Sequence, residues 1–235
     1  AVHPDDVELG CAGTLIKHAA KGQSVGIVDL TKGELGTRGT PELRIIEAND
    51  AAKVMGLKIR ENCGMRDGFF KNDEEHQLQL IQYIRKYQPN IVIANALDDR
   101  HPDHGRAGKL IADACFLSGL SKIETQFEDK PQQAWRPKRV FHMIQDRTVD
   151  PTFIVDISGF MDKKMEAIQC YKSQFHQPES NEPLTYIATS AFLDQIRYRD
   201  ALLGKKIGTA YAEGYVSLNI PGIDDLDSLV LPELA

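Results

Sequence analysis

The segment that most constrains the fold is the run Asn90-Ile91-Val92-Ile93-Ala94-Asn95, in which every residue between the two asparagines is apolar. A strand with one face in water alternates apolar and polar residues, whereas a continuous apolar run is typical of a parallel strand covered on both faces. The sequence therefore predicts a parallel sheet here, with helices packed against both of its faces.

Predicted strands and helices alternate through the first two-thirds of the chain. Helices are expected at residues 10–22, 40–56, 74–88, 104–118, 158–175 and 187–203, with Gly204 ending the last of them. Strands are expected at residues 24–30, 59–63, 90–95, 139–145, 152–157 and 211–218, and residues 119–137 are expected to be irregular. This order predicts an α/β fold, a Rossmann-like and mostly parallel sheet flanked by helices and wound by right-handed crossovers.

The length of 235 residues fits one domain, spanning residues 1–235, that buries a substantial core. The chain passes into a motif from its first residues, so we expect a strand of roughly 5–7 residues to belong before Ala1.

Charge, hydropathy and cysteine spacing narrow the class of protein. The formal net charge of −6 gives no sign of a general nucleic-acid binder. No apolar run approaches the ~18 residues of a membrane-spanning helix. The four cysteines are widely separated, without metal-finger spacing, which favours free thiols in a reducing compartment. We therefore expect a cytoplasmic protein that binds neither nucleic acid nor membrane.

Two histidine-proline-aspartate sequences lie where predicted strands end. The first is His3-Pro4-Asp5-Asp6, and the second lies within Asp98-Asp99-Arg100-His101-Pro102-Asp103-His104. One such sequence is usually a turn with a capping acid. Ligands in α/β sheets, however, gather at the carboxyl ends of strands, so two such motifs in one sheet indicate the two halves of one metal site.

A catalytic zinc site commonly takes three protein ligands and leaves one position for water. His3, Asp6 and His104 could supply such a set, but spacing alone does not choose between Asp5 and Asp6, or between His101 and His104. The aspartate that does not bind the metal is expected beside the bound water as a base. Sites of this composition also accept iron, manganese or cobalt.

The same residues carry a resemblance to a known family. The opening from Ala1 to Gly13 resembles the A-H-P-D-D-x-E-x-x-x-G-G signature of the LmbE/PIG-L-like metal-dependent deacetylases, although Val2 precedes the histidine and Cys11-Ala12-Gly13 stands where two glycines are common. The His101-Pro102-Asp103-His104 segment looks like the second motif of the family. The stretch from Leu30 to Arg44 is similar to the branch that deacetylates N-acetylglucosaminyl-malate in bacillithiol biosynthesis.

The resemblance implies a role for each motif residue. It implies Zn2+ bound by His3, Asp6 and His104, and Asp5 as general base. His101 matches the histidine that stabilises or protonates the reacting groups, and Asp103 matches the residue that orients that histidine. The implied reaction is hydrolysis of the N-acetyl amide of a small-molecule amino-sugar conjugate.

Substrate binding and assembly are implied less directly. Arg44, Arg100 and Arg139 stand at positions like those of family arginines near the site, where they would bind the carboxylates of a malyl group. Tyr186 lies in a loop region from which related enzymes bring a tyrosine toward the oxyanion. Relatives form hexamers, so we expect a homo-oligomer. Three alternatives stay open: a deacetylase of another N-acetyl sugar, an amidase of a thiol conjugate, and a non-catalytic sugar- or metal-binding module.

Overall fold

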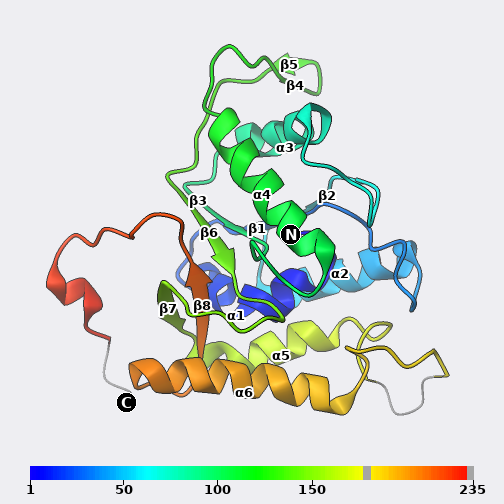
Figure 1. Cartoon of the computed structure of the whole chain (residues 1–235), viewed down its shortest axis with the longest axis vertical. Coiled ribbons are helices and arrows are strands. Elements are labelled where there is room, and N and C mark those ends of the chain that lie inside the picture. The colour runs from blue at the N-terminus through cyan, green and yellow to red at the C-terminus, as the bar shows by residue number, and fades with distance from the viewer. Residues whose placement is uncertain (177–180, 232–235) are drawn as a thin grey trace.

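The computed structural model describes residues 1–176 and 181–231 (Figure 1). Its α-helices are α1 (Asp6–Ala20), α2 (Pro41–Met55), α3 (Glu74–Tyr87), α4 (Pro102–Leu117), α5 (Met161–Gln169) and α6 (Ser190–Ile207). Its strands are β1 (Gly26–Asp29), β2 (Ile59–Asn62), β3 (Ile91–Ala94), β4 (Gln126–Phe127), β5 (Lys130–Pro131), β6 (Arg139–Met143), β7 (Phe153–Asp156) and β8 (Ala212–Val216), with short 3-10 turns η1 (Ser158–Phe160) and η2 (Leu226–Leu229).

The strands form two main groups that the first residues of the chain connect. β1 pairs in parallel with β2, and β3 pairs in parallel with β6, while β8 lies antiparallel between β6 and β7. The carbonyl oxygens of Ala1 and Val2 accept hydrogen bonds from Leu30 and Thr31 just after β1, and the amide of Val2 donates to the Asn95 side chain just after β3, at 3.0 Å. These bonds bring the carboxyl ends of β1 and β3 to the same place.

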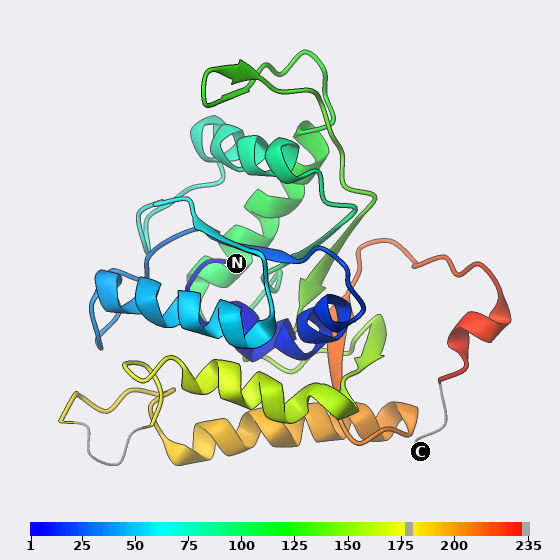
Figure 2. The same ribbon diagram turned by 180° about the vertical axis from the view of Figure 1, so that it is seen from behind.

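Helices cover both faces of this sheet (Figures 1 and 2). On one face, α3 and α4 pack together over a cluster that includes Ile81, Leu110 and Ala94. On the other face, α1, α2 and α5 pack over a cluster that includes Ile16, Met55 and Ile168, and α6 packs against β8. The predicted α/β fold is confirmed, and β3 contributes to both clusters, since Ala94 belongs to the first and Ile93 packs against the second.

The boundaries of several elements differ from the sequence predictions. Helix α1 begins at Asp6 and not near Gly10, and it bends at Cys11, where φ is −150°. Helix α6 runs past Gly204 and ends at Ile207, followed by Gly208, whose φ of 74° suits a residue without a side chain. Gly204 instead lies against the following backbone, since a Cβ there would be 2.7 Å from the carbonyl oxygen of Thr209.

Two other predicted segments are also corrected. The predicted helix at residues 158–175 consists of η1 followed by α5, which ends at Gln169. The region predicted as irregular contains the β4–β5 pairing. Among the described residues, no helix is both long enough and apolar enough to cross a membrane.

A buried ionic cluster joins α5, α6 and β8. The Nζ of Lys164 donates to Asp200 at 2.6 Å and to Glu213 at 2.8 Å, and all three side chains are fully buried. The Glu213 carboxylate also accepts from the backbone amides of Gly13 and Thr14 at the bend of α1. This cluster therefore ties α1 to α5, α6 and β8, and Gly13 and Glu213 are 200 residues apart in the sequence.

Replacing Lys164 with methionine is expected to lower the free energy of unfolding by about 3–5 kcal/mol, because two buried carboxylates lose the ammonium group that pairs with both of them. Lys163→Met is the matched control: its side chain is exposed on the same helix, so a change within about 0.5 kcal/mol is expected. Urea denaturation of both variants measures the difference. Equal effects of the two substitutions would show that the cluster does not stabilise the fold.

Candidate active site

Asp5 stands at an unusual backbone turn immediately before α1. Its φ is 117°, in the region that favours glycine, and its side chain makes no capping hydrogen bond to α1. The carboxylate instead accepts a hydrogen bond from the Nη2 of Arg44 at 2.9 Å, and Arg44 also donates to the carbonyl oxygens of Pro4 and Gly33. A strained backbone beside buried polar groups is a frequent mark of a functional residue.

Asp6 lies between two histidines and has partners at both carboxylate oxygens. Its Oδ2 accepts from the His3 backbone amide at 3.0 Å and from the Asn95 side chain at 2.9 Å, and lies 3.7 Å from His3 Nδ1. Its Oδ1 lies 3.1 Å from His104 Nε2 and accepts from the Gln145 side chain at 3.1 Å. The carboxylate is thereby fixed with one oxygen toward each histidine.

Each of these histidines has a second carboxylate on its other ring nitrogen. His3 Nε2 lies 3.0 Å from Asp67 Oδ1, and His104 Nδ1 lies 2.5 Å from Asp99 Oδ2. A carboxylate in this position selects the tautomer and fixes the ring of a metal-binding histidine. His3 Nδ1 and His104 Nε2 are consequently the nitrogens that face Asp6.

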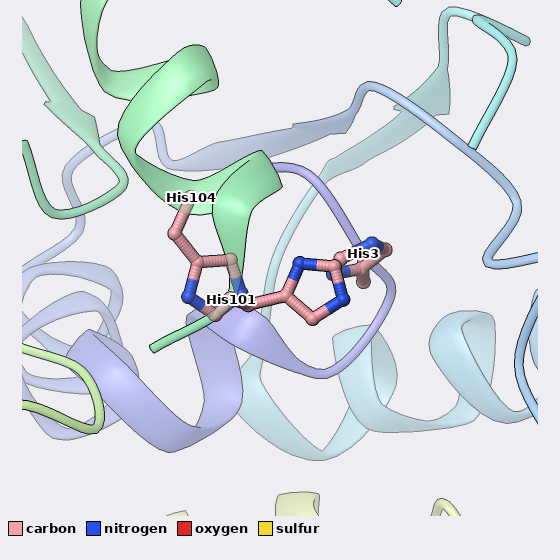
Figure 3. A group of neighbouring side chains, drawn as sticks. All are labelled: His3, His101 and His104. Atoms are coloured by element: carbon pink, nitrogen blue, oxygen red, sulfur yellow. The ribbon is translucent and has the colours of Figure 1, made fainter. Parts of the chain in front are cut away.

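His101 completes a cluster of three imidazoles (Figure 3). His101 and His104 come from the start of α4 and His3 from the first loop, and nitrogens of the three rings lie within 4.8 Å of one another. His101 Nδ1 accepts from the backbone amide of Asp103 at 3.3 Å. The Asp103 carboxylate faces other partners, namely the Gly68 amide at 2.9 Å, Arg106 at 2.6 Å and His3 Nε2 at 3.7 Å. Asp103 thus contacts His101 through its backbone and not through the carboxylate expected to orient it.

The electrostatics of the site differ between its groups. Burial lowers the pKa of His104, but Asp6 and Asp99 more than offset this and raise it to about 10. For His3, burial is likewise outweighed by Asp103, Asp67 and Asp6, and its pKa is about 9. Burial lowers the pKa of His101, and the charges of His3 and His104 lower it further. Burial raises the pKa of Asp5 to about 7 although Arg44 opposes the shift.

These residues fit a divalent cation. The carboxylates around His3 and His104 favour a positive charge between the two rings and Asp6. Protonated imidazoles supply this charge in the absence of metal, and a bound cation supplies it when both rings are neutral. Imidazole and carboxylate donors suit zinc, iron, manganese and cobalt alike. His101 is a further possible ligand, because its nitrogen is within reach of the other two rings.

The arginines and the tyrosine expected to bind substrate lie in three different places. Arg44 is buried and its guanidinium contacts the carboxylate of Asp5. Arg100, which directly precedes His101, packs against Tyr186. Its guanidinium carbon lies 4.5 Å from the centre of the tyrosine ring, and both side chains contact Asp146. Arg139 is exposed at the start of β6, opposite Ile91, so the structure does not bring it to the carboxyl ends of the strands where the histidines lie.

Several polar residues of the site were missed by the sequence predictions. Asn95 follows β3, Gln145 follows β6 and Asp67 follows β2, so all three stand beyond the carboxyl end of a strand. That position was the available signal. Asp99 was visible beside the second motif, but its contact with His104 depends on the turn that leads from β3 into α4.

Comparisons with known proteins agree with the resemblance of the motifs. The family described as "PIG-L: GlcNAc-PI de-N-acetylase" matches residues 1–115. The diacetylchitobiose deacetylase of Thermococcus kodakarensis is 30% identical over 94% of this chain and 81% of its own length. The solved structure of the conserved protein TT1542 from Thermus thermophilus superimposes on this chain with a TM-score of 0.85. The match covers 96% of each chain at 36% sequence identity.

More distant relatives differ in the reactions that their names describe. A Bacillus anthracis protein named "Probable N-acetyl-alpha-D-glucosaminyl L-malate deacetylase 2" is 25% identical over 74% of this chain and 78% of its own length. The 4-oxalmesaconate hydratase of Pseudomonas putida is 26% identical over 75% of this chain and 72% of its own length.

Removing the negative charge of Asp99 is expected to weaken metal binding without unfolding the protein. In Asp99→Asn, His104 loses the carboxylate that fixes its ring, and the dissociation constant for Zn2+ should rise about 10–100-fold. Competition with a chromogenic chelator measures this constant. Asp98→Asn is the control, because Asp98 is exposed and pairs with Arg147. Equal metal affinities in the two variants would contradict a positioning role for Asp99.

Proposed function

We propose that this chain, which belongs to the PIG-L family of GlcNAc-PI de-N-acetylases, hydrolyses the N-acetyl group of an amino sugar at a metal site formed by His3, Asp6 and His104. The observation that carries the proposal is the position of Asp6, with one carboxylate oxygen facing each histidine, next to the differently directed carboxylate of Asp5. Zinc is the cation we propose, because two histidines and one carboxylate form a ligand set typical of zinc hydrolases.

The chain's own residues divide the chemistry between them. A bound divalent cation supplies Lewis acidity that polarises the amide carbonyl and makes water more acidic. Asp5 accepts a proton from the attacking water, and Arg44 holds its carboxylate in position. His101 stabilises the tetrahedral oxyanion or donates a proton to the leaving nitrogen, its Nδ1 being occupied by the Asp103 amide. Water adds to the carbonyl carbon, the C–N bond breaks, and acetate and a free amine leave.

The finer proposal is that the substrate is N-acetylglucosaminyl-malate, the acetylated intermediate of bacillithiol biosynthesis. The segment from Leu30 to Arg44 supports it, as does the malate deacetylase relative from Bacillus anthracis. Of the three arginines, Arg100 is the one we propose to bind a carboxylate, because it directly precedes His101 and its side chain is half exposed. The four cysteines are free, in keeping with a reducing cytoplasm. The assembly we propose is a homo-oligomer, with the hexamer that the family resemblance implies.

A second candidate substrate is an N-acetylated chitooligosaccharide. The Thermococcus kodakarensis diacetylchitobiose deacetylase, at 30% identity over nearly the whole chain, favours this class. The charges beside the second motif are also consistent with a neutral sugar. Arg100 pairs with Asp146 and Arg147 pairs with Asp98, so the charge of each arginine is already balanced by a carboxylate. Either substrate would release acetate, which a hydratase or a binding module would not.

Asp5→Asn is expected to lower kcat by about 10²–10⁴-fold while zinc stays bound, because the amide cannot accept the proton of the attacking water. Amine release from N-acetylglucosaminyl-malate measures the rate, and metal analysis confirms zinc in the variant. Asp50→Asn, at an exposed position on α2, serves as control. A variant within tenfold of the unmodified protein would show that Asp5 is not the base.

A substrate panel is expected to separate the two sugar classes. If Arg100 binds a malyl carboxylate, Arg100→Ala should raise KM for N-acetylglucosaminyl-malate about tenfold or more and leave KM for diacetylchitobiose unchanged. Arg139→Ala, which removes an exposed arginine elsewhere on the sheet, should change neither. Equal rates on the malyl conjugate and on neutral N-acetylglucosamine would rule out the carboxylate clamp. Absence of acetate from every zinc-loaded reaction would rule out the deacetylase.

A further inference from the structure

Arg199, on α6, uses all three nitrogens of its guanidinium to join parts of the chain that are far apart in sequence. Its Nε donates to Asp200 at 3.0 Å. Its Nη1 donates to the carbonyl oxygen of Gln145 at 3.1 Å, 54 residues away, and its Nη2 to the carbonyl oxygen of Leu9 at 2.6 Å, 190 residues away. A planar guanidinium donates in several fixed directions at once, so this side chain holds α1, α6 and the segment after β6 in one geometry.

The contact with Leu9 lies beside the bend of α1. In a regular helix the amide of Gly13 donates to the carbonyl oxygen of Leu9, four residues earlier. Here the helix bends at Cys11, and the amide of Gly13 donates to the carboxylate of Glu213 at 2.8 Å. The carbonyl oxygen of Leu9 accepts from Arg199. The two charged side chains therefore bind the acceptor before the bend and the donor after it.

Both carbonyl groups that Arg199 holds belong to segments that shape the candidate metal site. Leu9 lies in the first turn of α1, which begins at Asp6. The side chain of Gln145 donates to Asp6 at 3.1 Å, and its nitrogen lies 3.4 Å from His104 Nε2. Arg199 thus joins the turn that carries one carboxylate of the site to the residue whose side chain holds that carboxylate.

The same helix offers a matched arginine with different surroundings. The side chain of Arg199 is 22% exposed, and its partner Asp200 is fully buried and also pairs with Lys164. Asp200 orients the guanidinium at Nε and leaves both Nη nitrogens for the backbone. Arg197, two residues earlier, pairs with the exposed Asp162 at 3.5 Å. Arg197 is therefore a control for the loss of one positive charge on α6.

We infer that Arg199 is a positioning residue for the metal site and acts through Gln145 and the first turn of α1. Without its guanidinium, these two segments lose the group that joins them, and Asp6 is held less firmly between His3 and His104. Metal binding is then weakened. The expected effect on turnover rests on the deacetylase function proposed above, whereas the effect on metal binding does not depend on the substrate.

The experiment compares Arg199→Met with Arg197→Met in metal binding. The dissociation constant for Zn2+, measured by competition with a chromogenic chelator, should rise about 10–100-fold in Arg199→Met. The visible absorption spectrum of the Co2+-loaded variant should also differ from that of the unmodified protein, because the ligand geometry changes. Arg197→Met should match the unmodified protein in both measurements. If Arg199→Met matches it as well, and urea denaturation shows only a loss of stability, the side chain is merely structural and the inference is overturned.

Arg199→Lys separates geometry from charge, and it decides the question if the methionine variant does not fold. Lysine keeps a positive charge beside Asp200, but one ammonium group does not reproduce the planar fork that reaches two carbonyl oxygens, so Zn2+ affinity should stay about tenfold or more below that of the unmodified protein. Full affinity in this variant would overturn the inference in favour of charge alone.

Turnover provides a separate measurement. In zinc-saturated Arg199→Met, kcat for amine release should fall about 10–100-fold while KM stays nearly unchanged, because the side chain acts on the metal site and not on the substrate. A fall in affinity through KM alone would contradict this role. If the unmodified protein binds Zn2+ but releases no amine from any N-acetyl sugar, the deacetylase function fails, and the Zn2+ affinities and Co2+ spectra still decide the role of Arg199.

Discussion

The carboxylate of Asp6 is the group on which the geometry of the candidate site depends. A buried carboxylate is costly unless its oxygens are hydrogen-bonded, and here Asn95 and Gln145 donate to it from the ends of β3 and β6. Those strands pair in parallel, so their carboxyl ends lie side by side and both amides reach one acceptor. The sheet thus fixes Asp6, and Asp6 in turn fixes the space between His3 and His104.

The adjacent aspartates have different surroundings because the backbone turns sharply between them. The positive φ of Asp5 costs about 1–3 kcal/mol, and the contacts of Arg44 with Asp5, Pro4 and Gly33 offset that cost. Asp5 therefore faces an arginine from α2, whereas Asp6 faces the histidines. This difference in surroundings is the physical basis for proposing that Asp6 binds the metal and that Asp5 accepts a proton from the attacking water.

The predictions from sequence were most accurate where a local signal was sufficient. Thr40 caps α2 through its side chain, and Gly56 ends it in a left-handed conformation, both as expected from composition. Boundaries were wrong where tertiary contacts decide them. Gly204 resembled a helix stop, but it is required where the returning chain passes against α6. Helix α1 starts early because Asp6, in its first turn, is held by partners that lie far away in the sequence.

The sequence by itself determined the fold class, the family resemblance and the meeting of two motifs at one edge of a sheet, because hydrophobic periodicity and residue spacing are local properties. Tertiary structure alone decided that Asp67 and Asp99 fix the two histidine rings, that Arg44 lies beneath Asp5, and that Arg139 stands apart. These relations join residues that are separate in sequence and meet only when strands, loops and helices pack. Spacing along a chain cannot specify the direction in which a side chain points after folding.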